Sequence, residues 1–171
     1  MAETEEPIKV HVEAFLVTGI EVRTTNEREM SGKGAIGMLW RRLMKDNLIE
    51  RIPHRVDNRL IAVYSDYASG KDGEYSYLLG ARVSSLKPAP DGMASRHIVA
   101  GDYAMFTAKG RPPAEMIVDI WKQIWSLETG NKLARAYRTD FEIYSDAANP
   151  ADTLVDVYVG LLFGQRTHGA G

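Results

Sequence analysis

The sequence predicts an α+β fold in which a β-α-β-β unit occurs twice. The strands are expected to form a mostly antiparallel sheet, with two helices on one side and a ligand cleft between the halves. The first observation is a repeat: Tyr64-Ser65-Asp66 recurs 80 positions later as Tyr144-Ser145-Asp146, and the same shift carries Gly80 onto Gly160. The second observation is that each half passes from a strand-like segment through a helical pattern into two more strand-like segments.

The first half is predicted to run strand, loop, helix, strand, strand. A stretch rich in β-branched and aromatic residues, Val10 to Arg23, favours a strand with a bend at Gly19. Apolar residues with helical spacing then follow a polar loop. The segments after the first strand are a loop at 26–34, a helix at 35–49, a strand at 60–64, a hairpin-type loop at 69–73 and a strand at 75–84.

The second half is predicted to repeat this plan after a linker at 87–92 that contains two prolines. Its helix begins after Pro112-Pro113, because proline suits the first turn of a helix. The surrounding strands are expected at 96–109, 140–145 and 154–163. We therefore expect one domain over 1–163, with repeat one at about 8–86, repeat two at about 94–163, and a tail at 164–171.

Composition excludes several classes of function. The net charge is −2, from 21 basic and 23 acidic residues, so a basic nucleic-acid-binding face is not expected. The chain has no cysteine, which excludes disulfides and thiolate catalysis. No apolar stretch is long enough to span a membrane, and the first residues are acidic rather than basic, so we expect a cytoplasmic protein. The four histidines show no metal-ligand spacing, and no metal or cofactor is expected.

One carboxylate interrupts the repeat, because Ala62 in the first half becomes Glu142 in the second. Alternation along this strand places Phe141 and Ile143 on one face, and we expect that apolar pair to lie under the helices. Glu142 and Tyr144 would then face a cleft on the opposite side. A lone buried carboxylate there favours a cationic guest; the alternative is an edge or solvent-facing glutamate.

Aromatic residues supply the rest of the candidate site. Tyr75 and Tyr77 share one face of their strand, and tyrosines suit a cleft because their hydroxyls need a polar neighbour. Trp121 and Trp125 lie four residues apart on an apolar helix face and are interpreted as core, whereas Trp40 is open to either role. Gly32-Lys33-Gly34-Ala35-Ile36-Gly37 fits a dinucleotide-binding pattern, but a long polar loop precedes it and the repeat does not suit a parallel sheet.

An ordered set of short motifs resembles the gyrase-inhibitor-like small-molecule-binding superfamily, the effector-binding domain of AraC-type and MerR-type regulators. The motifs are Tyr75 to Val83, Tyr103 to Phe106, a tryptophan-bearing helix, and Phe141 to Tyr144. Standalone relatives include proteins carried on integron gene cassettes. The resemblance implies a duplicated fold with a cleft, a cation-neutralising Glu142, a pocket lined by Tyr75 and Tyr77, and Trp40 as a wall.

The sequence departs from the fused regulators because it shows no helix-turn-helix, so direct binding to nucleic acid is not expected. The leading hypothesis is a binding protein for amphipathic organic cations, such as drugs or dyes, with Glu142, Tyr75, Tyr77, Trp40 and Tyr144 at the site. One alternative is a hydrolase of strained electrophilic metabolites, with Glu142 as base and Tyr77 or Tyr144 as donor. Another is a protein–protein inhibitor that uses the acidic stretch at 3–6. A homodimer and a separate regulatory partner both stay open.

Overall fold

The structure, a computed structural model, describes residues 6–87, 89–108, 113–150 and 153–162. The expected tail at 164–171 and the end of the last expected strand, Phe163, lie outside these residues. The described helices are α1 (Asn26–Met30), α2 (Ile36–Lys45) and α3 (Pro113–Thr129), with a short 3₁₀ turn at Leu48–Arg51. The described strands are β1 (Ile8–Val12), β2 (Phe15–Thr24), β3 (Leu60–Ser65), β4 (Tyr75–Val83), β5 (Ala94–Ile98), β6 (Gly101–Ala108), β7 (Arg135–Tyr144) and β8 (Val155–Leu161).

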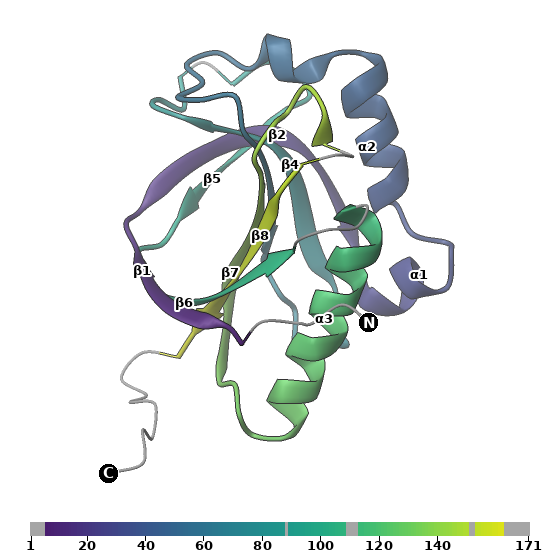
Figure 1. The fold of residues 1–171 in the computed structure, drawn as a ribbon. Helices are drawn as coiled ribbons and strands as arrows, with labels where there is room; N and C mark the ends of the chain where they lie inside the picture. The colour runs from purple at the N-terminus through teal and green to yellow at the C-terminus, as the bar shows by residue number, and fades with distance from the viewer. Residues whose placement is uncertain (1–5, 88, 109–112, 151–152, 163–171) are drawn as a thin grey trace.

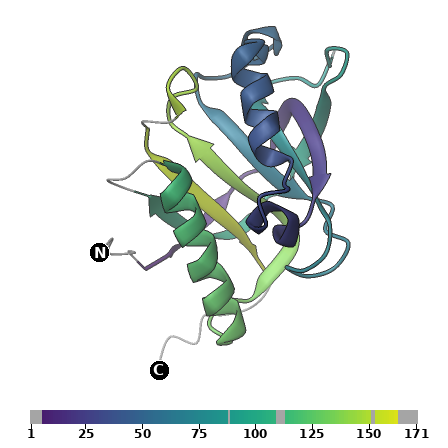
Figure 2. The same cartoon turned by 90° about the vertical axis from the view of Figure 1, so that its right-hand side faces the viewer.

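All eight strands join one antiparallel sheet in the order β1-β6-β8-β7-β3-β4-β2-β5. Helix α2 packs against β2 and β4, whereas α3 packs against β6 and β8. Figures 1 and 2 show both long helices over the same side of the sheet. The predicted α+β class, with a duplicated unit and two helices on one side, is therefore confirmed.

The duplication is visible in the strand order. The first half contributes β3, β4 and β2 outward from the centre, and the second contributes β7, β8 and β6 in the same sense. The halves meet at the β3–β7 pair. The first strand of each half pairs with a strand of the other half: β1 pairs with β6, and β5 pairs with β2.

These exchanged strands curl the sheet. Strands β1 and β2 are separated by only two residues in the chain, yet β1 is an edge strand and β2 lies near the opposite edge. The two ends of the sheet must therefore approach each other, and Figure 1 shows the purple β1–β2 ribbon arching across the molecule. As a result the sheet has a hydrophobic core on each face: a large one under the helices and a smaller one around Phe15, Ile61, Val63 and Phe141.

Two glycines allow the close approach of β2 and β4. Gly19 and Gly80 are opposite each other in the register. A Cβ at Gly19 would lie 2.2 Å from the carbonyl oxygen of Leu79, and one at Gly80 would lie 2.0 Å from that of Thr18. Neither position has room for a side chain, because both contacts are with backbone.

Several predicted boundaries were wrong. The segment expected to be one strand from Val10 to Arg23 is two, since the chain turns between β1 and β2, and the strand expected at 96–109 is likewise divided into β5 and β6. The expected loop at 26–34 contains α1, whose N-cap Thr25 accepts a hydrogen bond from the backbone of Arg28. The helix expected at 35–49 ends at Lys45, where Asn47 takes a left-handed conformation (φ 49°).

Candidate ligand-binding site

Glu142 lies at the centre of the sheet, on β7, and is only 1% exposed. Its Oε2 accepts hydrogen bonds from the Tyr64 hydroxyl (2.6 Å) and from Trp121 Nε1 (2.9 Å), and its Oε1 accepts one from the Tyr144 hydroxyl (2.9 Å). The donors come from β3, α3 and β7, so both halves hold the carboxylate. All three are neutral, and no described residue forms a salt bridge with Glu142.

Burial shifts the pKa values of Glu142 and of the two tyrosines that donate to it. Burial raises the pKa of Glu142 above its ordinary value, and the hydrogen bonds from Tyr64, Trp121 and Tyr144 offset part of that rise. Burial, followed by the nearby Glu142 carboxylate, raises the pKa of Tyr64 and Tyr144 well above the ordinary value. Both phenols therefore keep their protons and act as donors.

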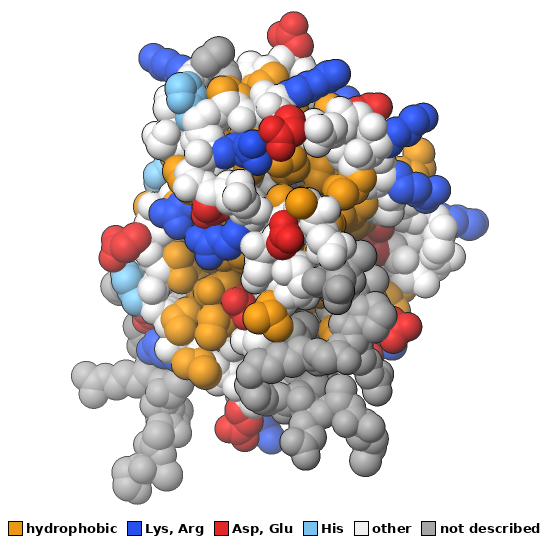
Figure 3. All heavy atoms as spheres, turned by 45° about the horizontal axis from the view of Figure 1, so that its top comes forward, with side chains coloured by type: hydrophobic (Ala, Val, Ile, Leu, Met, Phe, Trp, Pro, Cys, Tyr) orange, Lys and Arg blue, Asp and Glu red, His pale blue; other side chains and the backbone are white. Residues whose placement is uncertain are grey.

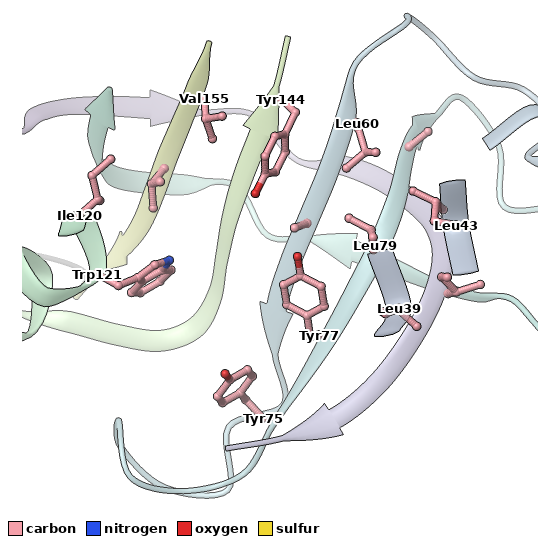
Figure 4. Packing of buried hydrophobic residues seen from close by; sticks show 14 of the residues in the cluster. Leu39, Leu43, Leu60, Tyr75, Tyr77, Leu79, Ile120, Trp121, Tyr144 and Val155 are labelled. Atoms are coloured by element: carbon pink, nitrogen blue, oxygen red, sulfur yellow. The ribbon is translucent and has the colours of Figure 1, made fainter. Parts of the chain in front are cut away.

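Aromatic rings surround the carboxylate. The Tyr64 ring centroid lies 5.1 Å from that of Tyr77 and 4.9 Å from that of Trp121. On the other side, Trp40 contacts Tyr144 edge-on at 4.8 Å and donates a 2.9 Å hydrogen bond to the Tyr77 hydroxyl. Figure 4 shows Trp121, Tyr144 and Tyr77 pointing toward one another in the space between α3 and α2.

A cavity of about 230 Å³ opens between the halves, beside this aromatic group, and is called the helix-side cavity below. Tyr64 and Trp121 belong both to its wall and to the hydrogen-bonded shell of Glu142. The carboxylate itself is not part of the lining. Further lining residues are Glu29, Ile36, Tyr67, Tyr75, Trp125 and Arg135.

The charges around the helix-side cavity leave a negative excess. Arg135 pairs with the buried Asp140 at 2.7 Å, and Lys71 pairs with Asp72 at 3.1 Å, so both cations of the lining have their own carboxylate. Glu29 has no cationic partner among the described residues. Its carboxylate accepts hydrogen bonds from the backbone N–H groups of Ala35 (2.9 Å) and Ile36 (3.1 Å), at the start of α2.

The structure separates the predicted site residues into two layers. Tyr75 lines the cavity, whereas Glu142, Tyr77 and Tyr144 are buried beside it and the partly buried Trp40 packs against them. The assignment of these five residues as the binding site stays a prediction.

Sequence reasoning gave too little weight to other residues. Trp121 was interpreted as core; it is 8% exposed and packs in the core, but it also binds Glu142 and lines the cavity. Tyr64 could have been found from the repeat, since it matches Tyr144 and both hydroxyls bind Glu142. Glu29 lay in a segment expected to be a loop, and no sequence signal connected it with the site.

The predicted facing of β7 was wrong. Glu142 and Tyr144 face the helices, and Phe141 faces the smaller core on the opposite side. Alternation misled here because both faces of this strand are buried, so the polar residue did not mark a solvent side. The donors that Glu142 requires lie under the helices.

Figure 3 shows one face on which hydrophobic side chains gather into a patch bordered by charged ones. None of the described helices combines the length and apolar character needed to span a membrane. Among the described residues, no group of three His, Asp or Glu side chains is arranged to hold a metal ion.

The match to a family model assigns the chain, with its duplicated fold, to the effector-binding class of small-molecule-binding proteins. The chain belongs to the Cass2 family of integron-associated effector binding proteins, whose model matches residues 10–161. It is 29% identical over 155 residues to the protein YobU of Bacillus subtilis strain 168, covering 88% of this chain and 94% of YobU. It is 31% identical over 150 residues to the transcriptional regulator BrlR of Pseudomonas aeruginosa, covering 85% of this chain but only 52% of BrlR.

Solved structures share the fold. The integron cassette protein VCH_CASS2 from the mobile metagenome of Vibrio cholerae matches with a TM-score of 0.77 and 24% identity, over 93% of this chain and 97% of that protein. The protein SAV2435, solved bound to tetraphenylphosphonium, matches with a TM-score of 0.72 and 13% identity, over 93% of this chain and 95% of that one. At these identities the likeness is one of fold.

Proposed function

We propose that the protein binds amphipathic organic cations in the helix-side cavity, with Glu142 as the counter-charge. The observation that carries the proposal is the state of Glu142: a fully buried carboxylate with three neutral donors and no cationic partner among the described residues. Burying a carboxylate without a cation is costly, and that cost is relieved when a cation approaches. A cationic ligand therefore gains more from this site than a neutral one of the same shape.

The aromatic rings supply the second part of the affinity. Tyr64, Tyr75, Trp121 and Trp125 present ring surface to the cavity. Aromatic faces attract organic cations by roughly 0.5–2 kcal/mol each. Flat apolar groups on the ligand would also be removed from water there, so selectivity for lipophilic cations follows from the same residues.

Access to the carboxylate requires movement. The cavity of about 230 Å³ is smaller than the roughly 300–1,000 Å³ of typical ligand pockets. Tyr64 and Trp121 stand between it and Glu142. We expect a bulky cation to displace these two side chains. The fold shared with SAV2435, whose structure holds tetraphenylphosphonium, supports this class of ligand.

The direct test is calorimetric titration with tetraphenylphosphonium and with tetraphenylborate, which has nearly the same shape and the opposite charge. Wild type should bind the cation saturably and reject the anion at this site. Glu142→Gln should weaken cation binding by about tenfold or more, which corresponds to roughly 1.4 kcal/mol. Glu13→Gln, which removes a charge at an 86% exposed side chain, should bind as wild type does. Equal affinity of Glu142→Gln and wild type would refute the role of Glu142.

The two alternatives receive less support. For a hydrolase, Glu142 would have to take a proton within hydrogen-bond distance, although its carboxylate already accepts three hydrogen bonds; attraction to a cation acts over a longer distance and needs no such contact. For a protein–protein inhibitor, residues 3–5 of the acidic stretch lie outside the described part of the chain. Turnover of a strained electrophile that is abolished in Glu142→Gln would restore the first alternative.

A further inference from the structure

A second cavity, of about 180 Å³, lies on the face of the sheet opposite the helices and is called the sheet-side cavity here. It is lined by aromatic rings and charged side chains, including Phe15, Phe141, Tyr158, Asp57, Arg59 and Arg82. None of these residues belongs to the helix-side cavity. The sheet itself separates the two cavities.

The floor of the sheet-side cavity is a preformed aromatic surface. Phe141 and Tyr158 stack with centroids 4.6 Å apart and an interplanar angle of 14°, and Phe15 meets Phe141 edge-on at 5.2 Å. Phe15 and Phe141 are 7% and 1% exposed, so the smaller core holds these two rings in place. Such a surface suits a small, flat ligand.

The rim carries a net positive charge. Asp57 accepts two hydrogen bonds from the guanidinium of Arg59, at 3.1 and 3.0 Å, and these two charges offset each other. Arg82 has no corresponding partner: no described residue forms a hydrogen bond or an ion pair with its guanidinium. Arg82 is solvent-exposed, and its Cζ lies 4.9 Å from the centroid of the Phe15 ring, which places the charge beside the aromatic floor.

We propose that the sheet-side cavity binds a small planar organic anion, such as an aromatic carboxylate, with Arg82 as its counter-charge. The ring of the ligand lies against the partly exposed Tyr158, which stacks on the buried Phe141, and its carboxylate accepts hydrogen bonds from the planar guanidinium fork of Arg82. The protein therefore has two sites of opposite charge preference, one on each face of the sheet. This second site does not depend on the cation site.

The test is calorimetric titration with benzoate and with benzamide, its neutral counterpart of similar shape. Wild type should bind benzoate saturably, and benzamide should bind at least tenfold more weakly. Arg82→Gln should lose tenfold or more in benzoate affinity, and Arg82→Lys should lose part of it. Arg42→Gln removes one exposed charge from α2, on the other side of the sheet, and should leave benzoate binding unchanged. Thermal unfolding confirms that each variant is folded.

Competition separates this site from the helix-side cavity. Benzoate should bind with the same affinity when tetraphenylphosphonium is saturating. Displacement of benzoate by the cation, unchanged benzoate affinity in Arg82→Gln, or no saturable binding at millimolar benzoate would each overturn the proposal. If sedimentation shows a dimer, and benzoate neither binds nor shifts the monomer–dimer equilibrium, the proposal also fails.

Discussion

Ala62 and Glu142 lie directly opposite each other on β3 and β7, and they are also the equivalent positions of the two halves. The approximate two-fold relation between the halves therefore passes through this pair. A carboxylate on the axis cannot be repeated by the symmetry without placing a second one against it. The difference between alanine and glutamate at this pair gives the duplicated fold a single, central acid.

This relation predicts the effect of restoring the symmetry. Ala62→Glu would bury a second carboxylate next to Glu142, and no described cation is placed to offset it. We expect a loss of at least about 3 kcal/mol in the free energy of unfolding at pH 7, measured by urea denaturation. Ala62→Gln, of similar size and without charge, should lose less. Equal losses in the two variants would mean that volume, and not charge, is limiting at this pair.

The raised pKa of Glu142 predicts how stability depends on pH. The folded protein holds this proton to higher pH than the unfolded chain, in which a glutamate has a pKa of about 4.3. The stability that protonated Glu142 contributes is fully present below that pH and is lost as pH rises through the folded pKa. Glu142→Gln should lack this decline, so its stability relative to wild type should increase as the pH rises. The same dependence of the free energy of unfolding on pH in both proteins, measured by urea denaturation across the acid range, would contradict this prediction.

The same group predicts how cation binding depends on pH. Only the ionised carboxylate attracts a cation, so tetraphenylphosphonium affinity should rise as pH increases through the folded pKa of Glu142 and then level off. The affinity of Glu142→Gln should be low and nearly independent of pH over the same range. Calorimetric titrations at several pH values on both proteins provide the measurement. If the affinity of both proteins changed equally with pH, a residue other than Glu142 would be responsible for the pH dependence.

The two tryptophans of α3 offer a matched pair of substitutions. Trp121 donates to Glu142, whereas the buried Nε1 of Trp125 has no hydrogen-bond partner among the described residues. Trp121→Phe removes one of the two hydrogen bonds to Oε2 of the buried Glu142, where Tyr64 still donates, and should cost about 1–3 kcal/mol of stability. Trp125→Phe removes no hydrogen bond from Glu142 and should cost less, as urea denaturation can measure. A larger loss from Trp125→Phe would indicate that packing dominates over the hydrogen bond to Glu142.

The buried ion pair beside the cavity predicts a large coupled effect. Arg135 and Asp140 are 6% and 0% exposed, and Asp140 also accepts hydrogen bonds from Tyr67 and from the backbone N–H of Gly160 at 2.8 Å. Arg135→Met leaves the buried Asp140 carboxylate without its cation and should lower the free energy of unfolding by about 3–5 kcal/mol. Asp140→Asn should also destabilise, and the double variant should lose less than the two single losses combined.

An exposed ion pair serves as the control for these Arg135 and Asp140 variants. Lys9 and Asp102 are 3.6 Å apart, with side chains 44% and 47% exposed. Lys9→Met should cost less than about 1 kcal/mol. Additive losses from Arg135→Met and Asp140→Asn would show that the buried pair is not energetically coupled.

Much of the fold was accessible from local pattern. The 80-residue shift predicted two similar halves, and the expected strands at 60–64 and 75–84 differ from β3 and β4 by one residue or none at each end. The predicted strand boundaries were wrong where tertiary contacts determine them. The splits between β1 and β2, and between β5 and β6, follow from exchange of these strands between the halves, which no local spacing encodes. Helix α1 has five residues, too short to show a hydrophobic period.

The sequence by itself determined the repeat, the composition of the aromatic group, and the single acid that breaks the repeat, because each is a property of residue type and spacing. Only the tertiary structure decided which face of the sheet that acid occupies and which donors satisfy it. The physical reason is that the curled sheet buries both of its faces, so alternation no longer distinguishes inside from outside. The partners of Glu142 come from β3 and α3 as well as β7, and their meeting depends on how the two halves pack.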